Sequence, residues 1–263
     1  MIAHSESVGE SVVCLTFDVD WAHEEVVADT VGILERFGAK ATFFATHDSP
    51  LLRTLDPARY EIGLHPNFHP LLDGTGTGSF RATLDELMSL YPTACGLRSH
   101  SLVTSGRILA YARSRGIRYE SNMLLPQQVA PFRDYDGLMR VPMFWLDYRE
   151  MLVAPDFASQ DLALAHEVPA VFGFHPIHVF LNTERPERYE ASREHFQAPE
   201  ELRAHRNGSG TPGTRDFLSR LLERIDREGR KAVRMIDLVD AHEAAHGTAA
   251  ARPPSQPPSR GMR

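Results

Sequence analysis

The chain has 263 residues, of which 42% are hydrophobic and 24% charged, as in ordinary globular proteins with one large or two small domains. Its formal net charge of -7 argues against a nucleic-acid partner, because no surplus of basic residues neutralises phosphates. No stretch approaches the ~20 apolar residues of a membrane-spanning helix. Residues 1–9 lack the basic start and apolar centre of a signal peptide, so we expect a cytoplasmic protein without a membrane span.

Strand-like and helical patterns alternate along the chain. Apolar runs predict strands over residues 11–17, 41–46, 60–64, 94–97, 117–119, 138–142, 171–174 and 232–234. Apolar residues at helical spacing predict helices over residues 24–37, 80–90, 108–115, 217–227 and 236–246. Strands that alternate with helices form right-handed crossovers and a parallel sheet, and about seven such units favour an α/β barrel over an open sheet.

Three segments differ from this pattern. Residues 1–10 precede the first strand as an N-terminal extension, and residues 247–263 are rich in Pro and Ser, which predicts a disordered tail. Residues 182–213 are long, polar and charged, a composition typical of a lid or binding loop and equally of plain disorder. We therefore expect one barrel domain over residues 11–246 that carries this long loop.

Four short segments with chemically active side chains each follow a predicted strand. They are residues 18–20, 65–69, 98–100 and 175–178. The carboxyl ends of parallel strands converge at one end of a sheet, where ligands commonly bind. Carboxylates, imidazoles and a guanidinium gathered there are the groups that metal-assisted hydrolysis needs.

Asp18 and Asp20 are the first candidates. Residues two apart in an extended strand point to the same side, so both carboxylates can face the carboxyl end of the sheet. One would serve as a metal ligand and the other as a base. The alternative is that they cap the helix that begins at Glu24.

His65 and His69 lie at positions i and i+4, which share one face of a helical turn. Pro66 suits the first position of such a turn, where its missing N–H is not needed. With Asp20 they form a set of two histidines and one carboxylate, which suits Zn²⁺ in hydrolysis and also Fe²⁺ in oxygen chemistry. Two surface histidines in a loop are the alternative.

Arg98 and His175 complete the candidate machinery. Arg98 follows a short apolar strand, where a buried guanidinium would orient Asp18, or where it would simply be exposed. His175 ends the run 171–174 and fits a general acid, with a satisfied core histidine as the alternative. Asp147 is a possible hydrogen-bond partner of His175.

Other polar and aromatic residues near these segments stay open. The aromatic residues around Asp147 either stack on sugar rings or pack in the core; they are Phe144, Trp145 and Tyr148. His100 and His178 either support the site from behind or lie outside it.

The pattern resembles the polysaccharide deacetylase family, also called carbohydrate esterase family 4 or the NodB homology domain, and within it the WbmS-like branch. The matching segments, in the order of the family, are 16–20, 41–44, 63–69, Arg98 and 174–175. The resemblance implies a distorted (β/α)7 barrel. It also implies a role for each matching residue: Asp18 as general base, Asp20, His65 and His69 as metal ligands, His175 as general acid, and Arg98 steering Asp18.

Three features depart from the family pattern. Val19 separates two aspartates that are usually adjacent, although some branches share this spacing. The segment after Arg98 lacks the usual proline-rich continuation, and the motif that would supply a partner for His175 is unclear.

The resemblance implies a metal-dependent hydrolase that uses Zn²⁺ or another divalent transition metal. Its substrate would be an acetylated amino sugar or saccharide, deacetylated during synthesis of a bacterial surface polysaccharide. Hydrolysis of another C–N amide bond, as in allantoinase-like relatives, is one alternative. Another is a glycosyltransferase that uses residues 18–20 to hold a sugar nucleotide through Mg²⁺ or Mn²⁺. The last is a catalytically silent carbohydrate-binding protein.

Overall fold

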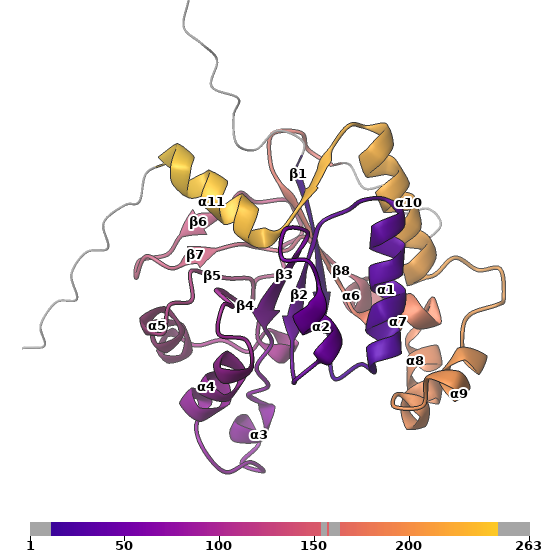
Figure 1. The fold of residues 1–263 in the computed structure, drawn as a ribbon, viewed down its shortest axis with the longest axis horizontal. Coiled ribbons are helices and arrows are strands. Elements are labelled where there is room, and N and C mark those ends of the chain that lie inside the picture. Colours follow the sequence, from indigo (N-terminus) through magenta and orange to yellow (C-terminus); the bar gives the residue numbers. More distant parts are fainter. Residues whose placement is uncertain (1–11, 154–156, 158–163, 247–263) are drawn as a thin grey trace, which may run out of the picture.

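One strongly curled, mostly parallel sheet organises the chain (Figure 1). The computed structural model describes residues 12–153, 157 and 164–246, so the predicted N-terminal extension and C-terminal tail lie outside the described residues. The ten strands are β1 Val12–Asp18, β2 Ala41–Ala45, β3 Tyr60–Leu64, β4 Gly96–Leu97, β5 Tyr119–Glu120, β6 Phe132–Arg133, β7 Met139–Arg140, β8 Trp145–Leu146, β9 Ala170–Phe174 and β10 Lys231–Val233.

The helices are α1 Glu24–Arg36, α2 Pro50–Thr54, α3 His69–Leu72, α4 Phe80–Leu90, α5 Gly106–Ser114, α6 Asp147–Val153, α7 Pro176–Leu181, α8 Pro186–Ser192, α9 Pro199–Ala204, α10 Thr214–Arg227 and α11 Met235–His246. In Figure 1, α1, α7 and α10 stand together along one side of the sheet, and α4 and α5 lie on the other side. None of the helices in the described part of the chain is long and apolar enough to cross a membrane.

The strands follow the order β6-β7-β5-β4-β3-β2-β1-β9-β8. Strand β1 lies centrally, with β9 along one edge, while its other edge pairs with β10 over Val12–Cys14 and with β2 over Thr16–Asp18. Strand β7 lies next to the edge strand β6, and β8 is the strand at the opposite edge. Because β7 and β8 are consecutive in the sequence, the short segment between them carries the chain from one side of the curled sheet to the other. The predicted α/β fold is confirmed, in the form of a half-barrel.

Aromatic side chains fill the space between β1, β9 and helix α10. Phe17 stacks on Phe43 and Phe174, with ring centroids 5.1 and 5.6 Å apart. Trp145 is 1% exposed and stacks on Phe217 of α10, with centroids 4.4 Å apart and planes 6° apart. Because it is buried and stacked in this way, Trp145 belongs to the core. Full burial of a large apolar side chain stabilises the fold by about 1.5–3 kcal/mol.

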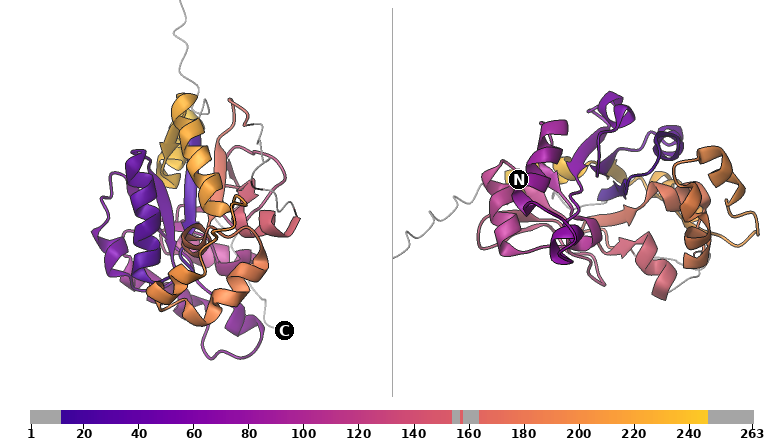
Figure 2. Two further views of the ribbon diagram at one scale, coloured as in Figure 1. Left: turned by 90° about the vertical axis from the view of Figure 1, so that its right-hand side faces the viewer. Right: turned by 90° about the horizontal axis from the view of Figure 1, so that it is seen from below.

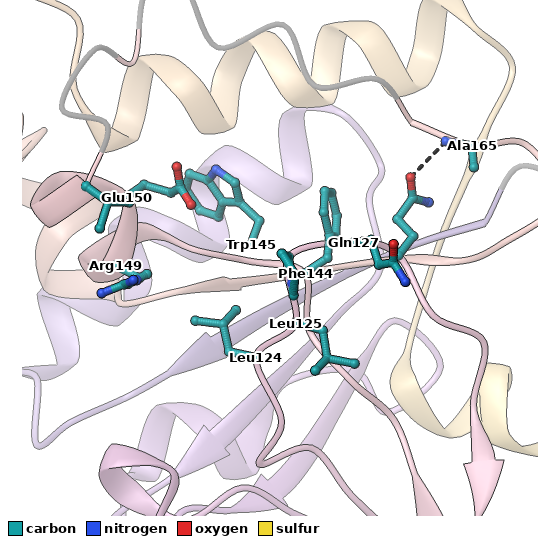
Figure 3. Close-up of a pocket in the computed structure, with 11 residues that line it drawn as sticks. Leu124, Leu125, Gln127, Phe144, Trp145, Arg149, Glu150 and Ala165 are labelled. Carbon is teal, nitrogen blue, oxygen red and sulfur yellow. Dashed lines mark hydrogen bonds between the residues drawn. The ribbon is translucent and has the colours of Figure 1, made fainter.

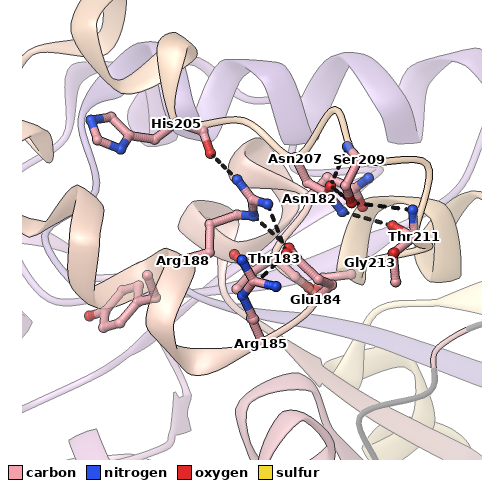
Figure 4. Close-up of polar contacts among 12 residues, drawn as sticks. Asn182, Thr183, Glu184, Arg185, Arg188, His205, Asn207, Ser209, Thr211 and Gly213 are labelled. Carbon is pink, nitrogen blue, oxygen red and sulfur yellow. Dashed lines mark hydrogen bonds and ion pairs between the residues drawn. The ribbon is translucent and has the colours of Figure 1, made fainter.

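Residues 182–213 contain two α-helices, α8 and α9, where the sequence suggested only a long loop. The ends of the segment meet, because the N–H and Oγ1 of Thr214 both donate to the carbonyl of Thr183, each at 3.0 Å. Gly213 is required here, since a Cβ would lie 2.1 Å from the carbonyl oxygen of Asn182. Arg188 then ties the segment internally by donating to both carboxylate oxygens of Glu184 (Figure 4).

This tied segment lies toward the lower end of Figure 1, where α3 and α8 are found, whereas α11 lies at the upper end. The two further views agree that α8 and α9 pack beside α7 (Figure 2). Since α3 follows β3 and α7 follows β9, this is the end at which the strands present their carboxyl termini.

Candidate active site

A pocket of about 300 Å³ lies at the carboxyl ends of β1 and β9. Its walls include side chains from all four segments singled out in the sequence, namely Asp18, Asp20, His65, His100, His175 and His178. The tied segment 182–213 adds Tyr189 of α8 to the same walls. The pocket is therefore assembled from elements that are far apart in the chain.

A buried ion pair forms one side of this pocket. Asp18 ends β1 and is 3% exposed, and its Oδ1 accepts from Arg98 NH1 at 2.8 Å. The fully buried Arg98 also donates to Thr16 Oγ1 and, through its other nitrogens, to Ser121. Its guanidinium lies 4.3 Å from the ring centre of Phe44. With all these partners in place, the guanidinium is fixed and orients the Asp18 carboxylate.

The backbone turns sharply after Asp18. Strand β1 ends there, and Asp20 and Trp21 have positive φ angles of 44° and 56°. The prediction that both aspartates share one side of an extended strand is therefore wrong, although both reach the pocket. A left-handed conformation costs a non-glycine residue roughly 1–2 kcal/mol, and such strain persists mainly at functional sites.

Asp20 is surrounded by imidazoles. Its Oδ1 lies 3.1 Å from His65 Nε2 and 3.1 Å from His100 Nδ1, and its Oδ2 lies 3.5 Å from His175 Nε2. Burial alone would raise the pKa of Asp20. The hydrogen bonds from His100 and His65 and the nearby charge of His175 instead hold that pKa well below its usual range. Asp20 is therefore an ionised carboxylate at neutral pH.

His65 and His69 are not on one helical turn. Helix α3 begins at His69, and residues 65–68 are not helical, so the predicted turn starting at Pro66 is wrong. Within the described residues, two groups of three side chains have donor atoms within 4.8 Å of one another: Asp20, His65 and His100 form one, and Asp147, His175 and His178 form the other. His69 is beside this set, with its ring edge-on to that of His100 at 5.9 Å.

The unsatisfied nitrogens of the two histidines test whether a metal fits. In the described part of the chain, His65 Nδ1 and His69 Nε2 are buried without a hydrogen-bond partner. Buried polar atoms are normally paired, and an unpaired one in a native structure commonly points to a ligand or ion. Imidazoles with one carboxylate are the donors that Zn²⁺ and similar ions prefer. The residues present therefore fit a divalent transition metal.

His175 forms the other side of the pocket, together with Asp147. Both Asp147 oxygens are used: Oδ2 accepts from the backbone N–H of His175 and Oδ1 contacts its Nδ1, each at 2.7 Å. Burial would lower the pKa of His175, but the charge and hydrogen bond of the fully buried Asp147 raise it to about 10. His175 therefore carries a proton at neutral pH, on an imidazole whose Nε2 faces Asp20.

His178 and two tyrosines line the wall beside His175. His178 is 2% exposed, and its Nδ1 lies 3.3 Å from Thr183 Oγ1 at the base of the tied segment. The ring of Tyr148 stacks on the ring of His178 with planes 13° apart. The ring centroid of Tyr189 lies 4.8 Å from that of His178. Burial lowers the pKa of His178 to about 4, so this imidazole is neutral. Of the aromatic residues near Asp147, Tyr148 is thus the one that lines the site.

A larger hollow of about 740 Å³ lies elsewhere on the molecule (Figure 3). Leu124, Leu125, Phe144 and Trp145 supply much of its lining, with Arg149 and Glu150 at one side. It contains none of the acid, base or metal-binding candidates. The smaller pocket is the candidate active site, because the candidate acid, base and metal-binding residues line it.

The sequence suggested Asp147 only as a possible partner of His175 and assigned no role to His100. Asp147 follows a strand of only two residues, β8, which is too short to show a pattern. His100 follows β4 directly after Arg98 and Ser99, and this position at a strand exit was the one signal available.

Comparisons with known proteins identify the family of this chain. Residues 15–193 match the family model described as WbmS-like polysaccharide deacetylase. A Bordetella bronchiseptica structure, described as a candidate polysaccharide deacetylase involved in O-antigen biosynthesis, is 40% identical with a TM-score of 0.78. The match covers 82% of this chain and 91% of that one. A search of curated proteins gave no match.

Two more distant structures share the fold. One is a carbohydrate esterase family 4 pseudoenzyme from Bacillus anthracis, with 15% identity, a TM-score of 0.53 and coverage of 88% of this chain and 66% of that one. The other is a peptidoglycan N-acetylglucosamine deacetylase, with 16% identity, a TM-score of 0.53 and coverage of 87% and 88%. With a family match over more than half its length and a relative at 40% identity, the chain belongs to the WbmS-like polysaccharide deacetylase family.

Proposed function

We propose that this protein is a metal-dependent hydrolase that removes the N-acetyl group of an amino sugar. One observation carries the proposal: Asp18, paired with Arg98, and His175, paired with Asp147, line the same pocket as Asp20 and His65. A base, an acid and a metal-binding set in one pocket are what hydrolysis of an unactivated amide needs.

The metal site combines residues from two strand exits. Asp20, His65 and His69 would hold a divalent transition metal, which when bound supplies Lewis-acid polarisation of the acetyl carbonyl and acidifies a water molecule. The buried, unpaired Nε2 of His69 and the position of His65 Nε2, 3.1 Å from Asp20 Oδ1, support this set. Their imidazoles favour Zn²⁺ over the Mg²⁺ or Mn²⁺ of a sugar-nucleotide transferase.

Asp18 is the proposed base. Its carboxylate takes a proton from the attacking water, and Arg98 keeps it aimed into the pocket through the 2.8 Å contact with Oδ1. The other oxygen of Asp18 is free of that contact and is the one placed to accept the proton.

His175 is the proposed acid. After water adds to the carbonyl carbon, the C–N bond breaks, and His175 Nε2 gives its proton to the departing amine. Asp147 holds the imidazole through Nδ1, so Nε2 is the nitrogen that carries the mobile proton. The products are acetate and a free amino sugar.

The similar Bordetella protein, described as involved in O-antigen biosynthesis, supports a substrate from bacterial surface-polysaccharide synthesis. The Bacillus anthracis protein with this fold is described as a pseudoenzyme, so the fold alone does not guarantee catalytic turnover. The chemistry must therefore be tested on this chain.

The test starts with metal content, measured by elemental mass spectrometry on the wild type and on His65→Ala. We expect about one transition ion per chain in the wild type, as in a mononuclear site, and its loss in the variant. His246→Ala, at an exposed position on α11, is the matched control and should keep the metal. A screen for acetate release from acetylated amino sugars follows, and release of acetate separates deacetylation from cleavage of a cyclic amide.

The base is tested with Asp18→Asn, which should keep the metal and lose turnover. Asp136→Asn, at an exposed position, is the control. An active Asp18→Asn protein would remove Asp18 as the base, and a wild type without metal after reconstitution would refute the proposed function.

A further inference from the structure

His100 is held beside His65 by the backbone. The parallel pairing of β3 with β4 continues beyond both strands, because the N–H of Arg98 donates to the carbonyl of Leu64 and that of His100 to the carbonyl of Pro66, each at 3.0 Å. Continued beyond the strands, this register sets Arg98 opposite His65 and His100 opposite Asn67, so the two strand exits lie side by side. The rings of His65 and His100 meet across these exits, with centroids 5.6 Å apart.

The side chain of His100 meets the same oxygen as His65. Asp20 Oδ1 lies 3.1 Å from His65 Nε2 and 3.1 Å from His100 Nδ1. Two ligands that each lie ~2.1 Å from one tetrahedral zinc ion are ~3.4 Å apart. The three donor atoms lie within 4.8 Å of one another and form a group that could hold one metal ion.

The backbone on both sides of this contact is strained. Five non-glycine residues in the described part of the chain have positive φ, and four of them are Asp20, Trp21, Ser101 and Leu102. These are Asp20 itself and the residues directly after Asp20 and His100. Trp21 also packs on the ring of His100, with centroids 5.3 Å apart. Backbone strain of this kind gathers at ligand clamps and active sites.

We infer that Nδ1 of His100 is itself a ligand of the metal ion that Asp20 and His65 also bind. The inference rests on the metal site of the proposed function and adds a ligand from a third strand exit. With His69, the site would offer four protein donors to the ion. The competing role for His100 is a hydrogen-bond donor to Asp20 that lies outside the coordination sphere.

The experiment uses Co²⁺ as the probe on metal-free full-length protein. Affinity is measured by competition with a chromophoric chelator, and coordination by the visible absorption of bound Co²⁺. The proteins are the wild type, His100→Ala, His100→Asn, His69→Ala and the control His246→Ala. Circular dichroism confirms that each is folded.

Loss of a partner that only orients a ligand weakens metal affinity about 10–100-fold, so loss of a true ligand should weaken it about 100-fold or more. We expect this for His100→Ala, together with a changed Co²⁺ spectrum. His100→Asn separates the two roles, because its amide N–H can replace the hydrogen bond to Asp20, whereas its amide oxygen is a poorer ligand than imidazole for a transition metal ion. The His100→Asn variant should therefore bind Co²⁺ as weakly as His100→Ala, and its Co²⁺ absorption spectrum should also differ from that of the wild type.

Wild-type affinity and spectrum in His100→Asn would overturn the inference and leave His100 as an orienting donor. His69→Ala tests the other histidine independently. A wild type that binds no Co²⁺, by contrast, would overturn the metal site and with it the proposed function.

Discussion

Two carboxylates, the buried Glu61 and the partly buried Asp20, lie toward opposite ends of the sheet and differ in their partners. Glu61, near the start of β3, accepts from Thr42 Oγ1 at 2.9 Å, from Tyr119 Oη at 2.8 Å and from the N–H of Ile236 at 2.8 Å. These donors are neutral, and burial raises the pKa of Glu61. Asp20 is instead approached by three imidazoles, and its pKa is lowered.

The difference shows how a structural polar cluster is distinguished from a functional one. Each oxygen of Glu61 has a donor, and neither Thr42 nor Tyr119 has a buried unpaired side-chain atom in the described structure. The cluster at Asp20 has two buried imidazole nitrogens without a partner, on His65 and His69. The Glu61 carboxylate is thus saturated by its neutral donors, whereas the imidazoles around Asp20 keep nitrogens that a bound ligand or ion could satisfy.

The largest effect is expected for Asp147→Asn, which removes the charge behind the acid. General acid catalysis contributes about 10²–10⁴-fold, so turnover should fall about 10³-fold, or about 4 kcal/mol, while the metal stays bound. The alkaline limb of the pH–rate profile should also move to lower pH, because the charge that raises the pKa of His175 is lost. Asp136→Asn is the control. An unchanged alkaline limb would contradict the assigned role of Asp147.

Glu61→Ala should produce the next largest effect, on stability and not on metal binding. It leaves three buried donors unpaired, which should lower the free energy of unfolding by about 3 kcal/mol in urea titrations. Asp20→Asn should show the opposite pattern, with loss of metal binding. If Glu61→Ala also lost the metal while folded, the division between structural and functional clusters would fail.

A smaller effect is expected from pH on the metal-free protein. Burial lowers the pKa of His178 to about 4, whereas an unfolded histidine titrates near pH ~6.5. The unfolded chain therefore binds the proton first as the pH falls, so the stability contributed by His178 is present above pH ~6.5 and is lost towards pH ~4. Between pH 7 and 5 the wild type should lose about 2 kcal/mol more than His178→Phe in urea titrations. Equal losses in both proteins would show that His178 does not carry this dependence.

Long apolar runs were sufficient to predict the main strands. β3 and α4 have the predicted bounds, and β1, β2 and β9 differ from the prediction by a single residue at one or both ends. Such runs are buried wherever they fold, so local pattern is enough for them. The two-residue strands β6 and β8 show no period, and helices α7 to α9 begin at prolines within segments that lack a clear apolar spacing.

The residue types of the site could be predicted from the sequence, because its aspartates, histidines and arginine directly follow predicted strands. Asp18, Asp20, His65 and His175 all line the pocket. The pairing of these residues was decided only by the tertiary structure. The rings of His65 and His100 meet across two neighbouring strand exits, with centroids 5.6 Å apart, and Asp20 contacts both from a turn that contains two left-handed residues. Contacts between strands depend on how a whole sheet curls, and spacing along one segment carries no information about that curl.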